Sequence, residues 1–198
     1  MVDVEWLAAR SGVVGPLVGF AATLSATALS PTFHWTANAL SDLGAAGAAN
    51  PWLFNWGLVA SAVLTVPFAW PLWVEADHPL ERLGSATFAG STVALALVGL
   101  FPEGTSLHLP VAVVYFSLLT FTLWIHGSGW VLAGLSRRGL LAVWLGIGHV
   151  LLWIGWLAAG FGGIAIPELG GSLALYAWIL LVVRTRPVAA PASGTTAG

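Results

Sequence analysis

Residues 139–167 read GLLAVWLGIGHVLLWIGWLAAGFGGIAIP and contain no Asp, Glu, Lys or Arg. A membrane-spanning helix needs about 20 mainly apolar residues, so this stretch is long enough to cross a bilayer once. The predicted span is 139–161, and its one ionisable side chain, His149, lies near the middle. The stretch therefore indicates an integral membrane protein.

The same reasoning extends to the rest of the chain. Charges, prolines and glycines punctuate apolar stretches of similar length. Together with 139–161 they predict six spans, the others at about 12–29, 52–74, 83–101, 107–127 and 167–183. We therefore predict an all-α bundle of six transmembrane helices that forms one domain over residues 1–186. Residues 187–198 are rich in Ala, Pro, Ser, Gly and Thr and predict a disordered cytoplasmic tail.

Composition excludes several classes of protein. Of the 198 residues, 58% are hydrophobic and 7% are charged, whereas a soluble domain carries roughly 25% charged residues. The formal net charge of −2 provides no basic surface for nucleic acid. The chain has no Cys, which excludes disulfides and thiolate metal sites. Membrane lipids are the expected partners and nucleic acid is not, while composition defines neither protein partners nor oligomeric state.

Arginine placement predicts the orientation. The chain has six Arg and no Lys. With six spans, every arginine falls on the same side of the membrane as the two termini, at Arg10, Arg82, Arg137, Arg138, Arg184 and Arg186. Because basic residues concentrate in cytoplasmic loops, we expect a multi-pass cell-membrane protein with both termini in the cytoplasm.

The first outward connection, residues 30–51, carries an unusual set of polar residues. Helix-starting and helix-ending residues flank 31–43 and predict a short interfacial helix there. On such a helix His34, Asn38 and Asp42 share one face, with Ser41 beside it. A carboxylate near a helix C-terminus is disfavoured, so Asp42 needs a compensating donor or cation.

The other outward connections add further acids and imidazoles at the same membrane level. Glu103 and His108 border the second of these connections, and Glu168 follows the third. Asn55 lies one turn inside the second span, and His149 is an intramembrane ionisable residue, which makes it a functional candidate. The topology therefore predicts one outward polar cluster. We assign Asp42 as its central carboxylate, Glu103 as the second, His34 and His108 as ligands or proton carriers, and Asn38, Ser41, Asn55, Glu168 and His149 to the surrounding polar network.

Two short motifs resemble a known family. Asn38-Ala39-Leu40-Ser41-Asp42-Leu43-Gly44 follows a His, and Phe101-Pro102-Glu103 is followed closely by His108; Ile166-Pro167-Glu168 fits as well. With these motifs the chain resembles the domain-of-unknown-function family 998 over about residues 12–183. The resemblance implies a small prokaryotic or archaeal membrane protein of about six helices, and it implies no activity.

Three functions remain open. The one we favour is a structural, partner-binding or lipid-binding membrane protein whose polar cluster holds the long connection on the bundle. The alternative is a membrane-embedded enzyme acting on a lipid or lipid-linked substrate. In that case His34, Asp42, Glu103 and His108 would bind a divalent metal or act as acid and base. A second alternative is a proton- or ion-coupled transporter that uses His149.

Overall fold

The computed structural model describes residues 4–184, and these residues form helices, turns and loops without any strand. The predicted tail at 187–198 lies outside the described residues. In chain order the α-helices are α1 (Val4–Ala28), α2 (Pro51–Thr65), α3 (Ala69–Val74), α4 (Pro79–Leu100), α5 (His108–Leu132), α6 (Ser136–Ala158) and α7 (Ala165–Arg184). Two 3-10 helices are also present, η1 (Leu40–Gly44) and η2 (Val66–Phe68).

Six helical units in the described chain are long and apolar enough to cross a membrane. One of them is composite, because α2, η2 and α3 together make the span Pro51–Val74. Pro67 lies in η2 and has no N–H for the helical ladder, which explains the local change to a tighter turn. The predicted all-α class and the six spans are confirmed, although α1 and α5 run several residues beyond the predicted bounds.

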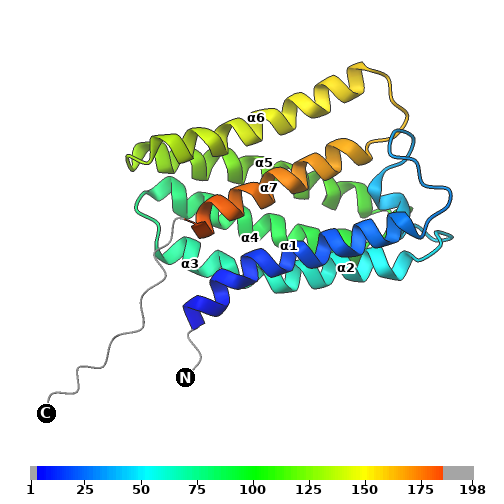
Figure 1. Cartoon of the computed structure of the whole chain (residues 1–198), viewed down its shortest axis with the longest axis horizontal. Helices are drawn as coiled ribbons and strands as arrows, with labels where there is room; N and C mark the ends of the chain where they lie inside the picture. Colours follow the sequence, from blue (N-terminus) through cyan, green and yellow to red (C-terminus); the bar gives the residue numbers. More distant parts are fainter. Residues whose placement is uncertain (1–3, 185–198) are drawn as a thin grey trace, which may run out of the picture.

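The spanning helices lie side by side and run up and down the bundle (Figure 1). Connections 29–50, 101–107 and 159–164 meet at one end, where Asp42, Glu103 and Glu168 are found; we call it the acidic end. The opposite end carries the described arginines and is called the arginine end: Arg10, Arg82, Arg137, Arg138 and Arg184. Arg186 lies outside the described residues. The chain thus separates its arginines from three of its acids by the length of a span.

Small residues allow the helices to approach closely. A Cβ atom at Gly84 would meet the backbone of His126 at 2.8 Å, and one at Gly129 would meet the Cγ of Glu81 at 2.6 Å. Because neither glycine has a Cβ atom, α4 and α5 can pack this closely. In the core beside them, the rings of Phe88 and Trp178 are fully buried, with centroids 5.5 Å apart.

The first connection departs from the sequence prediction. Residues 31–39 form turns instead of a helix, and the helical part is the 3-10 segment η1 alone. The prediction of a helix over 31–43 is therefore wrong. The physical reason is tertiary: the carbonyls of Thr36 and Asn38 accept hydrogen bonds from the backbone N–H groups of Gly163, Ile164 and Ala165. These bonds to the start of α7 replace the local bonds that a helix would make.

Candidate ligand-binding site

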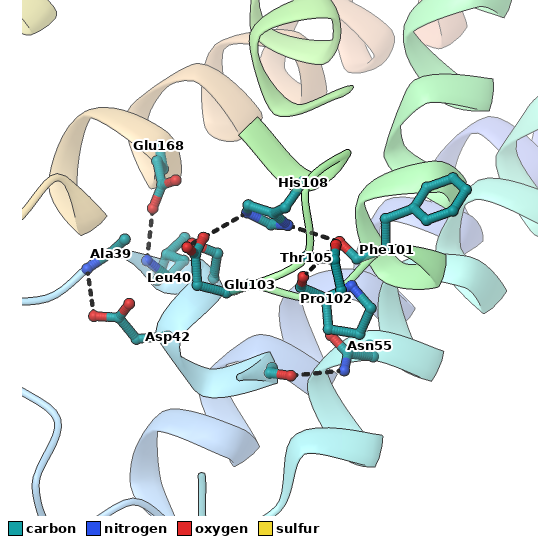
Figure 2. Close-up of polar contacts among 12 residues, drawn as sticks. Ala39, Leu40, Asp42, Asn55, Phe101, Pro102, Glu103, Thr105, His108 and Glu168 are labelled. Atoms are coloured by element: carbon teal, nitrogen blue, oxygen red, sulfur yellow. Dashed lines mark hydrogen bonds and ion pairs between the residues drawn. The ribbon is translucent and has the colours of Figure 1, made fainter. Parts of the chain in front are cut away.

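Glu168 joins the first connection to α7. Its carboxylate lies in the first turn of α7 and accepts a hydrogen bond from Leu40 N at 2.6 Å through Oε2. The residue is only 7% exposed. Figure 2 shows Oε2 directed at Leu40 while the second carboxyl oxygen points away from it. Glu168 was predicted as part of the polar network, and the structure places it where the connection, α7 and the bundle interior meet.

The donors that compensate the Asp42 carboxylate belong to its own connection. Its Oδ2 accepts hydrogen bonds from Asn38 Nδ2 at 2.8 Å and from Ala39 N at 3.0 Å. Asn38 Oδ1 in turn accepts from the backbone N–H of His34. The expected compensating donors are therefore amides. The His34 side chain is exposed and contributes only its backbone N–H to these bonds, so the predicted trio is linked by turns and not through a helix face.

Glu103, His108 and Ser41 form a second group. His108 Nε2 lies 2.9 Å from Glu103 Oε2, and Ser41 Oγ donates to the same oxygen at 3.1 Å. His108 Nδ1 lies 2.8 Å from the carbonyl oxygen of Phe101 and must donate to it, because a carbonyl only accepts. Both ring nitrogens of His108 are therefore used within the protein (Figure 2).

The geometry of this group differs from that of a serine nucleophile. In such a site the hydroxyl donates to an imidazole nitrogen that takes its proton. Here the Ser41 hydroxyl donates to the carboxylate of Glu103, and His108 has no nitrogen left for it. The group joins the 101–107 connection to η1 through the hydrogen bond between Glu103 and Ser41.

The four residues considered as metal ligands do not form one group. Glu103 and His108 are bonded to each other, Asp42 is bonded to amides, and His34 is exposed. Within residues 4–184 no group of three or more His, Asp or Glu side chains is arranged to hold a metal ion. The donor set therefore gives no geometric basis for the predicted divalent metal.

Asn55 and His149 stabilise helix packing. Asn55 Nδ2 donates to the carbonyl of Gly44 at 2.9 Å and so attaches the end of η1 to α2. His149 is 4% exposed; its Nε2 accepts from Trp153 Nε1 at 2.8 Å, and its Nδ1 lies 2.9 Å from Thr120 Oγ1. Thr120 Oγ1 donates its one hydrogen to the Phe116 carbonyl, so His149 Nδ1 donates to Thr120. An imidazole that accepts at one nitrogen and donates at the other is a neutral tautomer. Its two partners and its burial suit a packing residue between α5 and α6.

A cavity inside the bundle begins at these polar groups. A partly open space lies between α1, α2, α4, α5 and α7, with residues of η1 at its acidic end. Ser41, His108 and Glu168 line that end, while Pro16, Thr65 and Ile179 lie at the deep end. From Glu168 to Ile179 the helical rise gives a depth of about 16 Å, which is about half the hydrocarbon core of a bilayer.

The sequence prediction missed most of this cavity. Aromatic and aliphatic side chains dominate the lining. Besides Ser41, the lining residues that carry hydroxyl groups are Thr23, Ser61, Thr65, Thr92, Tyr115, Ser172 and Tyr176. Ser61 and Thr65 lie one turn apart on α2 and face the small residues Gly15 and Gly19 of α1. The sequence feature that could have indicated the cavity is the helical spacing of hydroxyl residues inside apolar spans. Spacing alone does not separate a cavity from a helix contact.

The fold and the site define a multi-pass membrane protein whose bundle contains a partly open, mainly apolar cavity with an acidic end. Comparison with protein families then assigns the chain. The family model described as "Protein of unknown function (DUF998)" matches residues 13–185, and the chain belongs to this family. Comparisons with curated proteins and with solved structures gave no significant match.

Proposed function

We propose that this protein binds a single-chain amphiphile, with the apolar chain in the bundle cavity and the polar head at the acidic end. The observation that carries the proposal is the cavity itself. It is lined mainly by aliphatic and aromatic side chains over the depth of one leaflet and ends at buried Glu168 and His108. Ligand pockets combine an apolar lining with a few fixed polar groups in this way.

Access from the membrane supports a lipid-like ligand. Phe20 of α1 and Tyr176 of α7 both line the cavity, their ring centroids lie 5.6 Å apart, and both rings are half-buried. They therefore lie where the cavity wall meets the lipid-facing surface of the bundle. We infer that the ligand enters between α1 and α7, beside these two rings.

The orientation of the bundle in the membrane decides which leaflet would supply the ligand. Because the described arginines lie together at one end, the positive-inside rule favours a cytoplasmic arginine end in the cell membrane. The acidic end then faces outward, and the ligand comes from the outer leaflet. This placement is part of the proposal and is tested separately from binding.

A cavity-filling substitution tests the proposal. Ala112 lines the cavity from α5, whereas its neighbour Val113 is 55% exposed on the outer surface of the same helix. Ala112→Phe should reduce photolabelling of the cavity residues by hexadecylamine and hexadecanol that carry a diazirine on the chain, by about tenfold. Val113→Phe is the matched control and should leave labelling unchanged.

Mapping the labelled peptides decides the outcome. Labels on cavity-lining segments of α1, α2 and α7 that Ala112→Phe removes would support intramembrane binding. Labels confined to lipid-facing residues, or equal in both variants, would refute it.

A further inference from the structure

We infer that the head group of the bound amphiphile is a protonated amine, held by the free carboxyl oxygen of Glu168. This inference rests on the proposed function and adds the chemical class of the ligand. It follows from a count of the hydrogen-bond donors and acceptors that the protein itself leaves unused at the acidic end of the cavity.

The donors there are already engaged. Ser41 Oγ donates to Glu103, and His108 uses both ring nitrogens on Glu103 and the Phe101 carbonyl. Ser172 Oγ donates to the Glu168 carbonyl at 3.2 Å, so its contact of 3.3 Å with Tyr115 must use the hydrogen of the Tyr115 hydroxyl. These polar side chains therefore have no donor hydrogen left for a ligand.

The acceptors are not all engaged. Glu168 lines the cavity and is 7% exposed. Its Oε2 accepts from Leu40 N, while no hydrogen bond joins Oε1 to any of residues 4–184. Figure 2 shows this second oxygen pointing away from Leu40. The oxygen of the Tyr115 hydroxyl can also still accept. A ligand that fits these groups must supply donors.

The charges at the acidic end also favour a cationic head group. The described part of the acidic end carries Asp42, Glu103 and Glu168 but no arginine, and the chain has no Lys. Of its two histidines, His34 is exposed, and both ring nitrogens of His108 are engaged by Glu103 and the Phe101 carbonyl. A helix N-terminus can bind an anion through its free N–H groups. Here the N–H groups of Gly163, Ile164 and Ala165 are bonded to the Thr36 and Asn38 carbonyls, and that of Glu168 is bonded to the Ile164 carbonyl. A carboxylate or phosphate head would be buried next to Glu168 without a counter-charge, which is unfavourable. An ammonium group instead supplies three donors and the opposite charge.

A head-group series tests this inference. Unlabelled hexadecylamine, hexadecanol, palmitate and hexadecyl phosphate share one chain and would compete with the diazirine probe for the purified protein. In the wild-type protein we expect hexadecylamine to compete at a concentration about tenfold lower than hexadecanol. Palmitate and hexadecyl phosphate should be weaker than both.

Two matched variants locate the selectivity. Glu168→Gln keeps an oxygen for Leu40 N but removes the negative charge, so hexadecylamine and hexadecanol should then compete at similar concentrations. Asp42→Asn removes a charge from the same end without touching the cavity lining, and it should keep the amine preference. A thermal unfolding curve shows that each variant is folded.

The outcomes separate the two proposals. Preference of the wild type for palmitate or hexadecyl phosphate, equal competition by all four compounds, or an amine preference that survives Glu168→Gln would overturn the ammonium assignment while leaving the binding proposal intact. If no probe labels the cavity in a way that Ala112→Phe prevents, the binding proposal itself fails.

Discussion

At the scale of single residues, the two carboxylate oxygens of Glu168 have different roles. Oε2 accepts from Leu40 N and fixes the first connection to α7, whereas Oε1 is left at the cavity. An acid within a membrane span is costly, and here the start of α7 offsets part of that cost because a helix N-terminus favours negative charge. The bond to Leu40 also holds the carboxylate in one orientation, so binding a ligand requires little further ordering.

Gly163 makes the docking of the first connection possible. A Cβ atom at this position would overlap the backbone of Ala37 and Asn38. Gly163→Ala should therefore push the connection away from α7 and lower the free energy of unfolding by about 1–3 kcal/mol, as overpacking does. Thermal unfolding in detergent measures this effect.

Gly162 provides the matched control for Gly163. It precedes Gly163 directly, and a Cβ atom there would meet no heavy atom within 4 Å. Gly162→Ala should leave the unfolding temperature unchanged. Equal effects of the two substitutions would contradict the close backbone contact as the cause.

The polar residues themselves were largely predictable, but their partners were not. The sequence placed Glu103 beside His108 and required donors for Asp42, and the structure has both features. It did not indicate that Asp42 would stay within its own connection or that Glu168 would become the acid facing the cavity. Those outcomes depend on which backbone N–H groups the folded connection brings near each carboxylate.

At the scale of elements, the first connection behaves as one unit attached at three places. It bonds to the start of α7, to α2 through Asn55, and to the 101–107 connection through Ser41 and Glu103. The predicted helix failed here because i, i+4 spacing is compatible with more than one backbone. His34 N and Asn38 Oδ1 do bond, as do Asn38 and Asp42, but through turns that leave the intervening carbonyls free for α7.

His149 connects three helices, and its removal tests that structural role. It bonds to Thr120 of α5 and Trp153 of α6, and its ring packs against Gly171 of α7, where a Cβ atom would lie 2.5 Å from Nε2. His149→Ala should leave a cavity and an unpartnered Trp153 N–H, lowering the free energy of unfolding by about 2 kcal/mol. The exposed His34→Ala is the control and should cost nothing measurable.

The His149→Ala variant also tests the transporter hypothesis. His149 is not among the residues that line the cavity, so His149→Ala should leave the amine preference of the folded protein unchanged. A loss of ligand selectivity without a loss of stability would instead give His149 a functional role, as the transporter hypothesis requires.

At the scale of the whole molecule, span number and charge placement could be predicted because each depends on local composition. Apolar length fixes the six spans, and the described arginines mark one end. The cavity could not be predicted, because it exists only between five helices whose relative rotations are set by contacts such as Gly15 with Ser61 and Thr65. Mean hydropathy is the same whether a side chain faces lipid, a neighbouring helix or a cavity.

The direction of the bundle in the membrane is the last prediction, and the chain suits a direct test because it has no Cys. Ala46 in the first connection and Ser136 at the start of α6 are both exposed and lie at opposite ends. With the arginine end in the cytoplasm, Ala46→Cys should react with a membrane-impermeant maleimide in intact cells. Ser136→Cys should react only after permeabilisation, and the cysteine-free parent should not react at all.

Each pattern of labelling has a separate meaning for the binding proposal. Labelling of both cysteines from one side would contradict the six-span arrangement. The reverse of the expected pattern would place Glu168 at the inner leaflet, and the amphiphile would then be drawn from the cytoplasmic side. The cavity, its acceptor-only polar end and the preference for an amine do not depend on that direction, because they arise from contacts within the bundle. Labelling therefore decides which leaflet supplies the ligand, and the head-group series decides which ligand it is.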